Sequence, residues 1–463
     1  MSTFGRFFRV TTFGESHCKG VGCIVDGVPP SLALTEADIQ PQLTRRRPGQ
    51  SKLTTPRDEK DLVTIMSGTE KGFTLGTPLA LFVPNENVRP KDYKEMDEVP
   101  RPGHADYTYQ MKYGTRASSG GGRASARETI GRVASGAVAE KWLREKFNTS
   151  IVAWVSSIGT VDMPRDLLND PKKSVYTRED VDTIGSIRIL RDPTKWTKVD
   201  DAAKQLENDK AYDTVFVKEE DDLATPAYID TEKVVYNRKG DVVPAPENLD
   251  AWLTDDLVPV RCPHPPSACA MSTVVRNMKV DEDSTGGVVT CVIKNVPVGL
   301  GEPCFDKMQA MLAHAMMSIP ATKGFEIGSG FSGTSKRGSE HNDPFCAGSD
   351  PSQPTKLGVT KNDAGGVLGG ITSGADIYFR VAIKPVSTIG RAQPTVSYDG
   401  KETVLEAKGR HDPCVLPRAV PLVEAMASLV IADAAMIQLA REGSTEAEPL
   451  QKKRKLKHFD DDT

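Results

Sequence analysis

The sequence lacks the cysteine patterns of a zinc site or of a disulfide framework. Its eight cysteines are scattered along 463 residues, with no CxxC pair and no paired Cys/His spacing. His264 in HPPSAC has no second pair of ligands beside it, and His341-Asn342-Asp343 is an isolated triplet typical of a turn. We therefore predict reduced thiols and no metal site.

Aromatic residues are scarce, at 6% of the chain, whereas glycine (39 residues) and proline (32 residues) are plentiful. This composition favours a turn-rich protein with many close backbone approaches, and it argues against a simple helical bundle. A chain of this length buries a large core whether it forms one domain or more.

The chain also lacks an excess of charge and a long apolar run. Lys and Arg total 59 against 63 Asp and Glu, so no global field gathers nucleic acid or anionic membrane. We find no apolar run approaching the roughly 20 residues that cross a bilayer. The sequence from Met1 passes directly into a strand-like pattern without a signal core, which favours a cytoplasmic location.

Periodicity predicts helices and strands in irregular order. Residues 6–30 predict a β-hairpin with His17 in its connection. The helices are expected at 126–147, 305–318 and 420–442, the last of them deeply buried. Further strands are expected within 286–299, 374–385 and 388–398. Without the regular alternation of a doubly wound sheet, the pattern indicates an α+β protein.

Two segments differ from the rest in composition. Residues from about 193 to 256 are charged and poor in apolar residues, although VFV and VVY predict short strands, and we interpret them as a surface insertion. The segment 446–463 contains KKRKLK followed by acidic residues and is expected to be a disordered tail. A nuclear-import signal is a weak alternative for its basic run. The prediction is one domain over 1–445 with this insertion.

Two of the seven histidines lie in dense small and polar segments, His17 in GESH and His104 in RPGHAD. Histidine is the side chain best suited to proton transfer near neutral pH. Either residue could instead only cap a turn, so both interpretations stay open.

Arginines form the second notable pattern. They occur in one predicted polar loop and around a triple-glycine turn, namely Arg45, Arg46, Arg47 and Arg57, then Arg116, Arg123, Arg127 and Arg132. Guanidinium groups match carboxylates and phosphates in two-point contacts, and glycines let backbone N–H groups approach phosphate. A solvated surface is the alternative, but acids are sparse between residues 112 and 127. We therefore predict a multiply charged anionic small molecule as ligand. The segment GGGRASARET is neither a Rossmann fingerprint nor a P-loop.

A third cluster, GRHDPC, precedes the buried C-terminal helix. Its Asp412-Pro413 pair fits either an N-cap followed by proline or a catalytic carboxylate at a helix entrance. A Ser-His-Asp hydrolase is a further alternative, but adjacent Ser16 and His17 do not easily adopt the nucleophile-to-base geometry, and no GxSxG elbow occurs.

Eight blocks, taken in order, resemble the chorismate synthase family. They are FGESH, GCIVDGVPP, RRRPGQS, RPGHADYTY, GGGRASARET, MSIPATKGFEIGSGF, NDAGGVLGGITSGADI and GRHDPCVLPRAVPLVEAM. The resemblance covers residues 7 to about 440, and the insertion is similar to that of eukaryotic members. It implies a β-α-β sandwich, with four central helices between antiparallel sheets, assembled as a homotetramer.

The resemblance also implies a reaction. The family is a lyase of the shikimate pathway, which leads to the aromatic amino acids. It converts 5-enolpyruvylshikimate-3-phosphate into chorismate and phosphate by anti-1,4-elimination, with reduced FMN and no net redox change. A substrate with two carboxylates and a phosphate accounts for the arginines. By resemblance, His17 protonates the departing phosphate, His104 acts on the reduced flavin, and Asp412 helps the flavin N5 take a proton. Ser16 and Ser125 support this relay.

The family's ligand contacts carry over to further positions. The implied FMN contacts are Arg123, Ala124, Ser125, Pro320, Ala321, Gly369, Lys384, Pro385, Val386, Ser387, Thr388 and Arg410. The implied substrate or NADPH contacts are Arg46, Arg47, Lys52 and Arg127. Lys52 stands where many relatives have arginine, and an ammonium does not make the two-point contact of a guanidinium. A catalytically silent anion-binding or scaffold protein with this fold is the alternative function.

Overall fold

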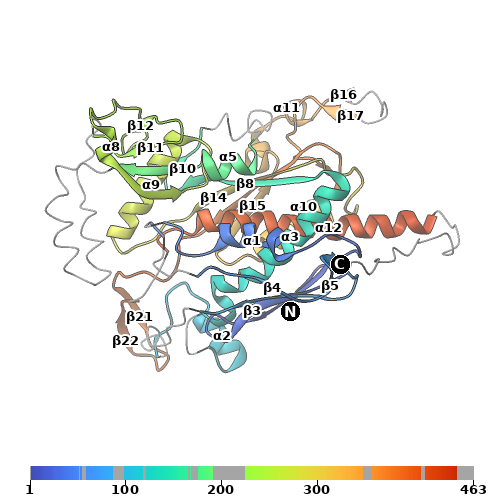
Figure 1. Cartoon of the computed structure of the whole chain (residues 1–463), viewed down its shortest axis with the longest axis horizontal. Coiled ribbons are helices and arrows are strands. Elements are labelled where there is room, and N and C mark those ends of the chain that lie inside the picture. Colours follow the sequence, from blue (N-terminus) through green and yellow to red (C-terminus); the bar gives the residue numbers. More distant parts are fainter. Residues whose placement is uncertain are drawn as a thin grey trace.

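The computed structural model places a bundle of helices between two β-sheets (Figure 1). It describes residues 2–445 except 52, 55–58, 87–97, 118–120, 165–166, 168–175, 191–224, 348–356 and 408–411. All strand pairs in the described residues are antiparallel, and the α+β class predicted from the sequence is confirmed.

The first sheet has the strand order β1-β2-β3-β7-β4. Its strands are β1 (Thr3–Phe4), β2 (Arg9–Gly14), β3 (Gly20–Asp26), β4 (Thr64–Ser67) and β7 (Leu79–Pro84). In β7, buried Leu79, Leu81 and Val83 alternate with partly exposed residues, as expected of a strand with one face on the core. Strands β2 and β3 form the predicted hairpin, and His17 lies in its connection. A small hairpin of β5 (Thr69–Glu70) and β6 (Phe73–Thr74) lies beside this sheet.

The second sheet has the order β15-β20-β14-β8-β9. Its strands are β8 (Ser150–Ile158), β9 (Val161–Asp162), β14 (Gly287–Lys294), β15 (Thr322–Ile327) and β20 (Ile377–Ile383). After its first residue, β8 is buried throughout, because other parts of the chain cover both of its faces. Shorter hairpins extend from this half of the chain: β16 (Phe345–Ala347) with β17 (Leu357–Val359), β18 (Val367–Leu368) with β19 (Ile371–Thr372), and β21 (Gln393–Val396) with β22 (Glu402–Leu405).

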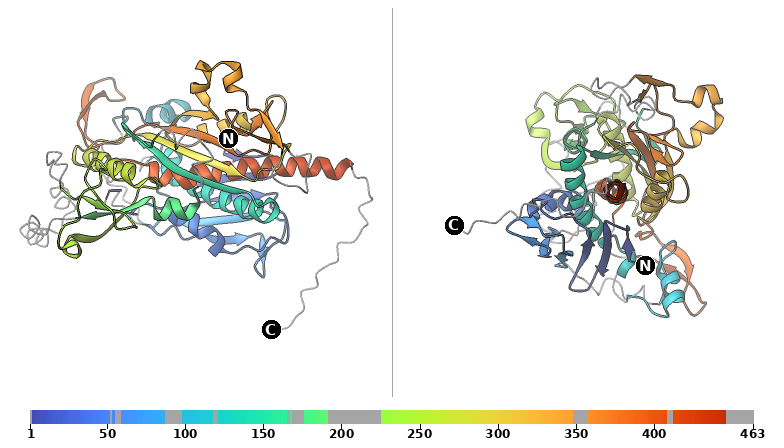
Figure 2. Two further views of the ribbon diagram at one scale, coloured as in Figure 1. Left: turned by 90° about the horizontal axis from the view of Figure 1, so that it is seen from above. Right: turned by 90° about the vertical axis from the view of Figure 1, so that its right-hand side faces the viewer.

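Four helices pack together between the two sheets, as Figure 2 shows in its end-on view. They are α1 (Glu36–Arg46), α3 (Thr129–Phe147), α10 (Met308–Met317) and α12 (Leu416–Thr445). Helices α3 and α12 approach so closely that a Cβ atom added at Gly136 would lie only 2.4 Å from the Cβ of Ala425. The remaining helices are α2 (Asp106–Tyr113), α5 (Arg178–Thr183), α8 (Leu249–Trp252), α9 (Pro265–Val280), α11 (Gly338–His341) and the 3-10 turns η2 (Gly122–Ala124), η3 (Ala126–Glu128) and η4 (Gly330–Ser335).

Helix α12 corrects the expectation that no apolar run approaches membrane-spanning length. Its segment Leu416–Glu442 is long and apolar enough to cross a bilayer, but 94% of its most apolar window is buried inside the protein. Pro421 lies inside this helix and cannot donate to the carbonyl of Pro417, four residues earlier. The guanidinium Nη1 of Arg261 donates to that carbonyl at 2.5 Å instead. The helix therefore continues through a proline because a distant side chain replaces the missing donor.

The predicted insertion is only partly a polar surface. Its C-terminal part contributes β11 (Tyr228–Ile229), β12 (Val235–Tyr236) and most of β13 (Leu253–Pro259) to a sheet with β10 (Ser186–Leu190), in the order β12-β11-β10-β13. Tyr228 and Tyr236 are buried against the main core, contrary to the expectation that the whole segment buries little. The predicted VVY strand is confirmed as β12, whereas VFV lies outside the described residues.

This arrangement predicts which part of the insertion is dispensable. Leu190 N donates to Ala227 O at 2.9 Å, so the chain leaves and re-enters the sheet at neighbouring positions. Replacing residues 193–224 by a short Gly/Ser turn should keep the protein folded and active, because the paired residues Leu190 and Ala227 on either side of the segment remain. Replacing 200–250 should instead unfold this region, since Tyr228 and Tyr236 are lost. Thermal unfolding and turnover of the two deletions would separate these outcomes, and an inactive but folded short deletion would contradict the prediction.

Other predicted elements agree with the structure in part. The 420–442 helix is confirmed and begins earlier, at Leu416, and the 305–318 helix is confirmed from Met308. Phe305, predicted to lie in that helix, precedes it and is 96% exposed. The sequence interpretation was wrong about Arg45 and Arg46, which do not lie in a polar loop but in the last turn of α1, where both are buried.

Candidate functional site

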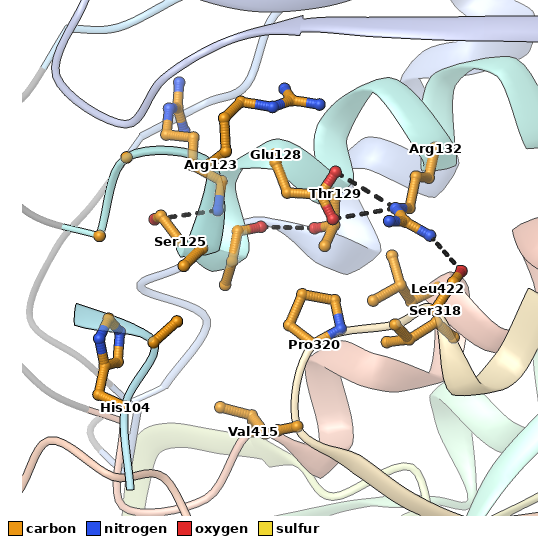
Figure 3. Close-up of a pocket in the computed structure, with 18 of the residues that line it drawn as sticks. His104, Arg123, Ser125, Glu128, Thr129, Arg132, Ser318, Pro320, Val415 and Leu422 are labelled. Atoms are coloured by element: carbon orange, nitrogen blue, oxygen red, sulfur yellow. Dashed lines mark hydrogen bonds and ion pairs between the residues drawn. The ribbon is translucent and has the colours of Figure 1, made fainter. Parts of the chain in front are cut away.

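A cavity of about 1280 Å³ opens where the N-terminal ends of α3 and α12 meet the loops around α2 and the end of β20. Most of the predicted site residues line it: Arg46, His104, Arg123, Ala124, Ser125, Arg127, Pro320, Ala321, Lys384, Val386, Ser387, Thr388 and Asp412. In Figure 3, His104 and Ser125 lie on one side of the cavity, and Pro320, Val415 and Leu422 lie across from them. The structure thus brings together side chains that are separated by about 300 residues in the sequence.

His104 is held by its own loop. Its Nδ1 lies 2.9 Å from Asp106 Oδ1, and Arg101 donates to both oxygens of that carboxylate, at 2.7 and 2.9 Å. Burial opposes ionisation of Asp106, but the hydrogen bonds from Arg101 and His104 outweigh it and hold the pKa of this carboxyl well below its usual range. An ionised Asp106 accepts a hydrogen bond from the Nδ1–H group of His104, which leaves Nε2 as the ring nitrogen available for proton transfer.

The His104 loop is joined to the residues that follow β20. Ser387 Oγ donates to Gly103 O at 2.7 Å, and Arg101 Nη1 donates to Thr388 Oγ1 at 3.1 Å. The ammonium of Lys384 also contacts Ser387 and Gly103. Burial, together with the nearby charge of Lys323, lowers the pKa of Lys384. Two predicted site segments are therefore fixed relative to one another.

The triple-glycine turn leads into α3 through η2 and η3, with Ser125 between them. Ser125 Oγ accepts from Arg127 N at 3.3 Å, and this bond caps η3. Arg123 reaches across to β2, where it donates to Gly14 O at 3.0 Å and to Thr12 Oγ1 at 2.6 Å. These contacts fix the wall of the cavity that carries Arg123, Ala124 and Ser125.

The arginines are more fully neutralised than the sequence suggested. Asp61 is buried, has a left-handed backbone (φ 50°), and receives Arg46 on one carboxylate oxygen and Arg127 on the other, both at 2.7 Å. Arg127 also pairs with Glu59. The acids come from a different segment of the chain, so local sequence could not reveal them. Arg46 and Arg127 line the cavity, but their ion pairs also connect α1 and η3 to the segment that contains Asp61.

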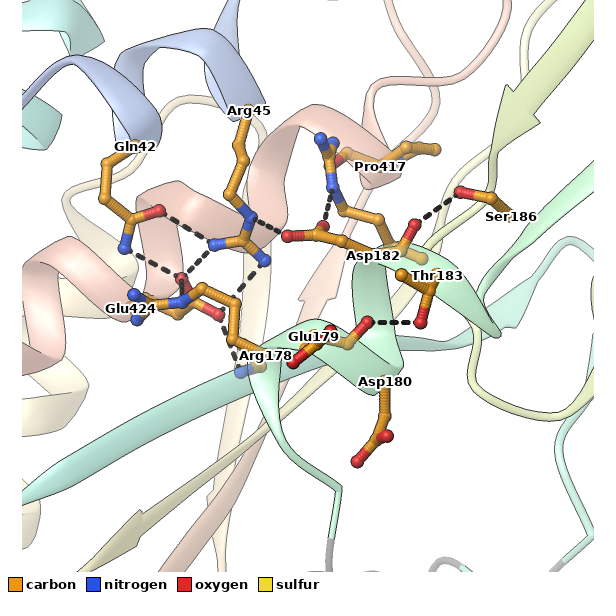
Figure 4. Close-up of polar contacts among 12 residues, drawn as sticks. Gln42, Arg45, Arg178, Glu179, Asp180, Asp182, Thr183, Ser186, Pro417 and Glu424 are labelled. Atoms are coloured by element: carbon orange, nitrogen blue, oxygen red, sulfur yellow. Dashed lines mark hydrogen bonds and ion pairs between the residues drawn. The ribbon is translucent and has the colours of Figure 1, made fainter. Parts of the chain in front are cut away.

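Arg45 enters a second polar network on the other side of α1 (Figure 4). The carboxylate of Glu424 on α12 is fully buried and accepts from Arg45, from Gln42 at 3.1 Å and from Ala153 N at 3.0 Å. Burial opposes its ionisation, but the charges of Arg45 and Arg178 outweigh this and lower the pKa of Glu424. This network joins α1, α12, α5 and β8, and the side chains of Gln42, Arg45, Arg178 and Glu424 all lie outside the cavity lining.

The network predicts a stability effect that is separate from activity. Glu424→Gln should lower the free energy of unfolding by about 3 kcal/mol or more, because it removes the fully buried negative charge that Arg45 and Arg178 share. Substrate KM should not change, since the carboxylate lies outside the cavity. Chemical denaturation and steady-state kinetics would test both statements. Asp399→Asn, at an exposed pair with Lys401, is the control and should leave the melting temperature unchanged. A raised KM in Glu424→Gln would contradict the separation.

Asp412 is not the N-cap of α12, so that interpretation was wrong. The helix begins at Leu416, and the carbonyl of Val415 accepts its first helical hydrogen bonds, from Arg418 N and Ala419 N. The carboxylate of Asp412 faces the cavity and pairs with Arg418.

Ser16 and His17, which as neighbours were not expected to adopt a nucleophile-to-base geometry easily, have their side chains in contact. Ser16 Oγ lies 2.9 Å from the Nδ1 of its neighbour His17, which the tight turn between β2 and β3 makes possible. In the described residues neither side chain lines the cavity, although Glu15 beside them does. The contact revives the geometric part of the hydrolase alternative, but the sequence still has no GxSxG elbow.

The remaining predicted residues either do not line the cavity or lie outside the described residues. Arg47, Pro385 and Gly369 do not line the cavity, and Gly369 lies in the turn between β18 and β19. Lys52, Arg57 and Arg410 lie outside the described residues. Among the described residues, no group of three or more His, Cys, Asp or Glu is placed to hold a metal ion. All eight cysteines are free thiols.

Sequence reasoning missed three residues that shape the site: Asp61, Arg101 and Arg418. Arg418 stands inside the block GRHDPCVLPRAVPLVEAM, and Arg101 is the first residue of the block RPGHADYTY, so block membership was the available signal. Asp61 had none, because its two arginine partners are 15 and 66 positions away.

Comparisons with known proteins agree with the geometry. Residues 8–436 match the family model for chorismate synthase. The chain is 52% identical to chorismate synthase of Saccharomyces cerevisiae, over 96% of this chain and 99% of the relative. It is 51% identical to chorismate synthase of Schizosaccharomyces pombe, over 95% and 97%. A crystal structure of chorismate synthase superimposes with a TM-score of 0.61 at 27% identity, covering 94% of each chain. The chain therefore belongs to the chorismate synthase family, and it is an enzyme of that type, a carbon–oxygen lyase.

Proposed function

We propose that the cavity holds reduced FMN together with 5-enolpyruvylshikimate-3-phosphate, and that the enzyme eliminates phosphate there to give chorismate. The observation that carries this proposal is the convergence of His104 and Asp412 with nine of the predicted FMN contacts on one cavity. Its volume of about 1280 Å³ exceeds the range of roughly 300 to 1,000 Å³ for single-ligand pockets, which supports two ligands side by side.

The residues present fit a flavin nucleotide. Pro320, Val415 and Leu422 offer an apolar wall for a planar ring, and Arg123 and Lys384 offer cations for a phosphate. Ala321 holds a left-handed backbone (φ 70°), rare outside glycine, and its carbonyl accepts from Lys384 N at 2.9 Å. Such strain is typical of segments shaped around a ligand.

Reduced FMN, when bound, supplies the electron-rich partner that the elimination needs without net redox change. For the chain's own residues, we assign His17 as the acid that protonates the departing phosphate and His104 as the group that acts on the reduced flavin. Asp412 would help a bound flavin take a proton at N5, and Ser16 and Ser125 would support this relay by hydrogen bonds. The contact of Ser16 with His17 and the position of Ser125 in the cavity wall support these assignments.

Three further properties belong to the same proposal: reduction of the flavin by NADPH, a homotetramer, and a cytoplasmic location without nucleic acid or membrane partners. The balanced charge and the burial of α12 support the last of these. Of the predicted reductant contacts, Arg46 has three donor atoms engaged by the protein.

An anaerobic assay tests the function directly. With chemically reduced FMN, the enzyme should release phosphate and chorismate in equal amounts. A folded protein that binds phosphate but forms no chorismate would support the silent-scaffold alternative. A parallel reaction with oxidised FMN and NADPH alone tests the reductase activity, and light scattering of the purified protein tests the tetramer.

A further inference from the structure

Arg418 lies in the first turn of α12, lines the cavity, and has only 11% of its side chain exposed. One end of its guanidinium, Nη1, pairs with the carboxylate of Asp412. Its Nε donates to the carbonyl of Arg46 at 3.1 Å. Arg46 is the last residue of α1, so this carbonyl is one of those that a helix end leaves without an intrahelical partner.

We propose that Arg418 is a positioning residue, which holds the carboxylate of Asp412 at the cavity and acts on the reaction through it. Asp412 precedes the helix and is therefore not oriented by helical hydrogen bonds. The planar guanidinium of Arg418 bridges it to the rigid end of α1, and a lysine ammonium does not reproduce this two-sided contact. The proposal rests on the proposed role of Asp412.

Helix α12 does not depend on Arg418 for its attachment. Arg261 donates to Pro417 O next to it, and Glu424 accepts from Ala153 N on β8. Further along the helix, Asp433 accepts from the backbone N–H groups of residues 6 to 8. Loss of Arg418 is thus expected to free one carboxylate and leave the helix in place.

A double-mutant cycle tests this inference. Single-turnover rates with pre-reduced FMN are measured for the wild type, Asp412→Asn, Arg418→Met and the double variant. Asp412→Asn should be about 10²-fold slower, the scale expected for loss of a positioned base. Arg418→Met should be roughly tenfold slower or more, and adding it to Asp412→Asn should slow the reaction no further, because residues that act as a unit are not additive. Arg418→Lys should fall between Met and the wild type.

The controls separate the possible failures. Arg261→Met removes a buried arginine that contacts the same end of α12 but does not line the cavity. This variant should have a lower melting temperature and an unchanged reaction rate. The inference is wrong, while the role of Asp412 stands, if Arg418→Met slows the Asp412→Asn variant by the same factor as it slows the wild type. The inference is also wrong if the single Arg418→Met variant turns over at the normal rate. A normal rate for Asp412→Asn would overturn both. Binding of oxidised FMN checks that each variant is folded, and Arg418→Lys replaces the Met variant in the cycle if the latter does not fold.

Discussion

His104→Ala should turn over roughly 10²-fold more slowly than the wild type, or worse, while still binding oxidised FMN. The imidazole is held by Asp106, which presents Nε2 for proton transfer, and alanine removes the transferring group without removing the cavity wall. The effect should persist with pre-reduced flavin under anaerobic conditions, because it concerns the elimination and not flavin reduction. Stopped-flow single turnovers would measure it.

Asp106→Asn tests the positioning of the same ring. An asparagine amide can donate to Nδ1 and so favours the wrong tautomer of His104. We expect a loss of about tenfold or more, on the scale of a charge-assisted hydrogen bond. His341→Ala is the matched control. The Nε2 atom of His341 lies 3.0 Å from Ser329 Oγ, and His341 does not line the cavity, so this variant should react at the wild-type rate. A near-wild-type rate for His104→Ala would exclude proton transfer by this residue.

Periodicity was a good guide wherever a face buries apolar side chains. The β2–β3 hairpin and helices α3 and α12 were predictable. In β3, Val21, Cys23 and Val25 occupy every second position and are buried, and α12 is apolar on most of its faces. Helix α1 was missed, because two of its buried positions are Arg45 and Arg46, which read as a polar loop. Their burial depends on Glu424 and Asp61, partners that local sequence does not contain.

The candidate site divides in the same way. The residues in compact blocks, such as His104 and Ser125, were found from their own segments. The residues that orient them were found less well, because pairing between distant segments leaves no local pattern. Helix α9 was missed although its own segment carried a signal. Pro265 and Pro266 stand in the first turn of this helix, after the N-cap His264, and proline is typical of the first position of a helix.

His17→Ala should lose about 10²-fold in turnover, and Ser16→Ala should lose about tenfold. Because Ser16 Oγ lies 2.9 Å from Nδ1, the ring presents Nε2 as the nitrogen that can protonate a departing phosphate. Removing the serine leaves the acid in place but releases its orientation, and one hydrogen bond is worth about 0.5 to 1.5 kcal/mol. Cys18→Ser, on the same turn, should react normally.

The two variants also decide between the lyase and the hydrolase use of this pair. In a lyase, Ser16 only orients His17, so Ser16→Ala retains measurable activity, and phosphate and chorismate stay in equal amounts in every variant. In a hydrolase, Ser16 would be the nucleophile, so its loss would be at least as severe as the loss of His17, and the wild type would release phosphate without chorismate. Measuring both products in each variant therefore distinguishes the two roles. Equal and complete losses in Ser16→Ala and His17→Ala would contradict the orienting role of Ser16, and a fully active His17→Ala would leave protonation of the phosphate to a group that lines the cavity.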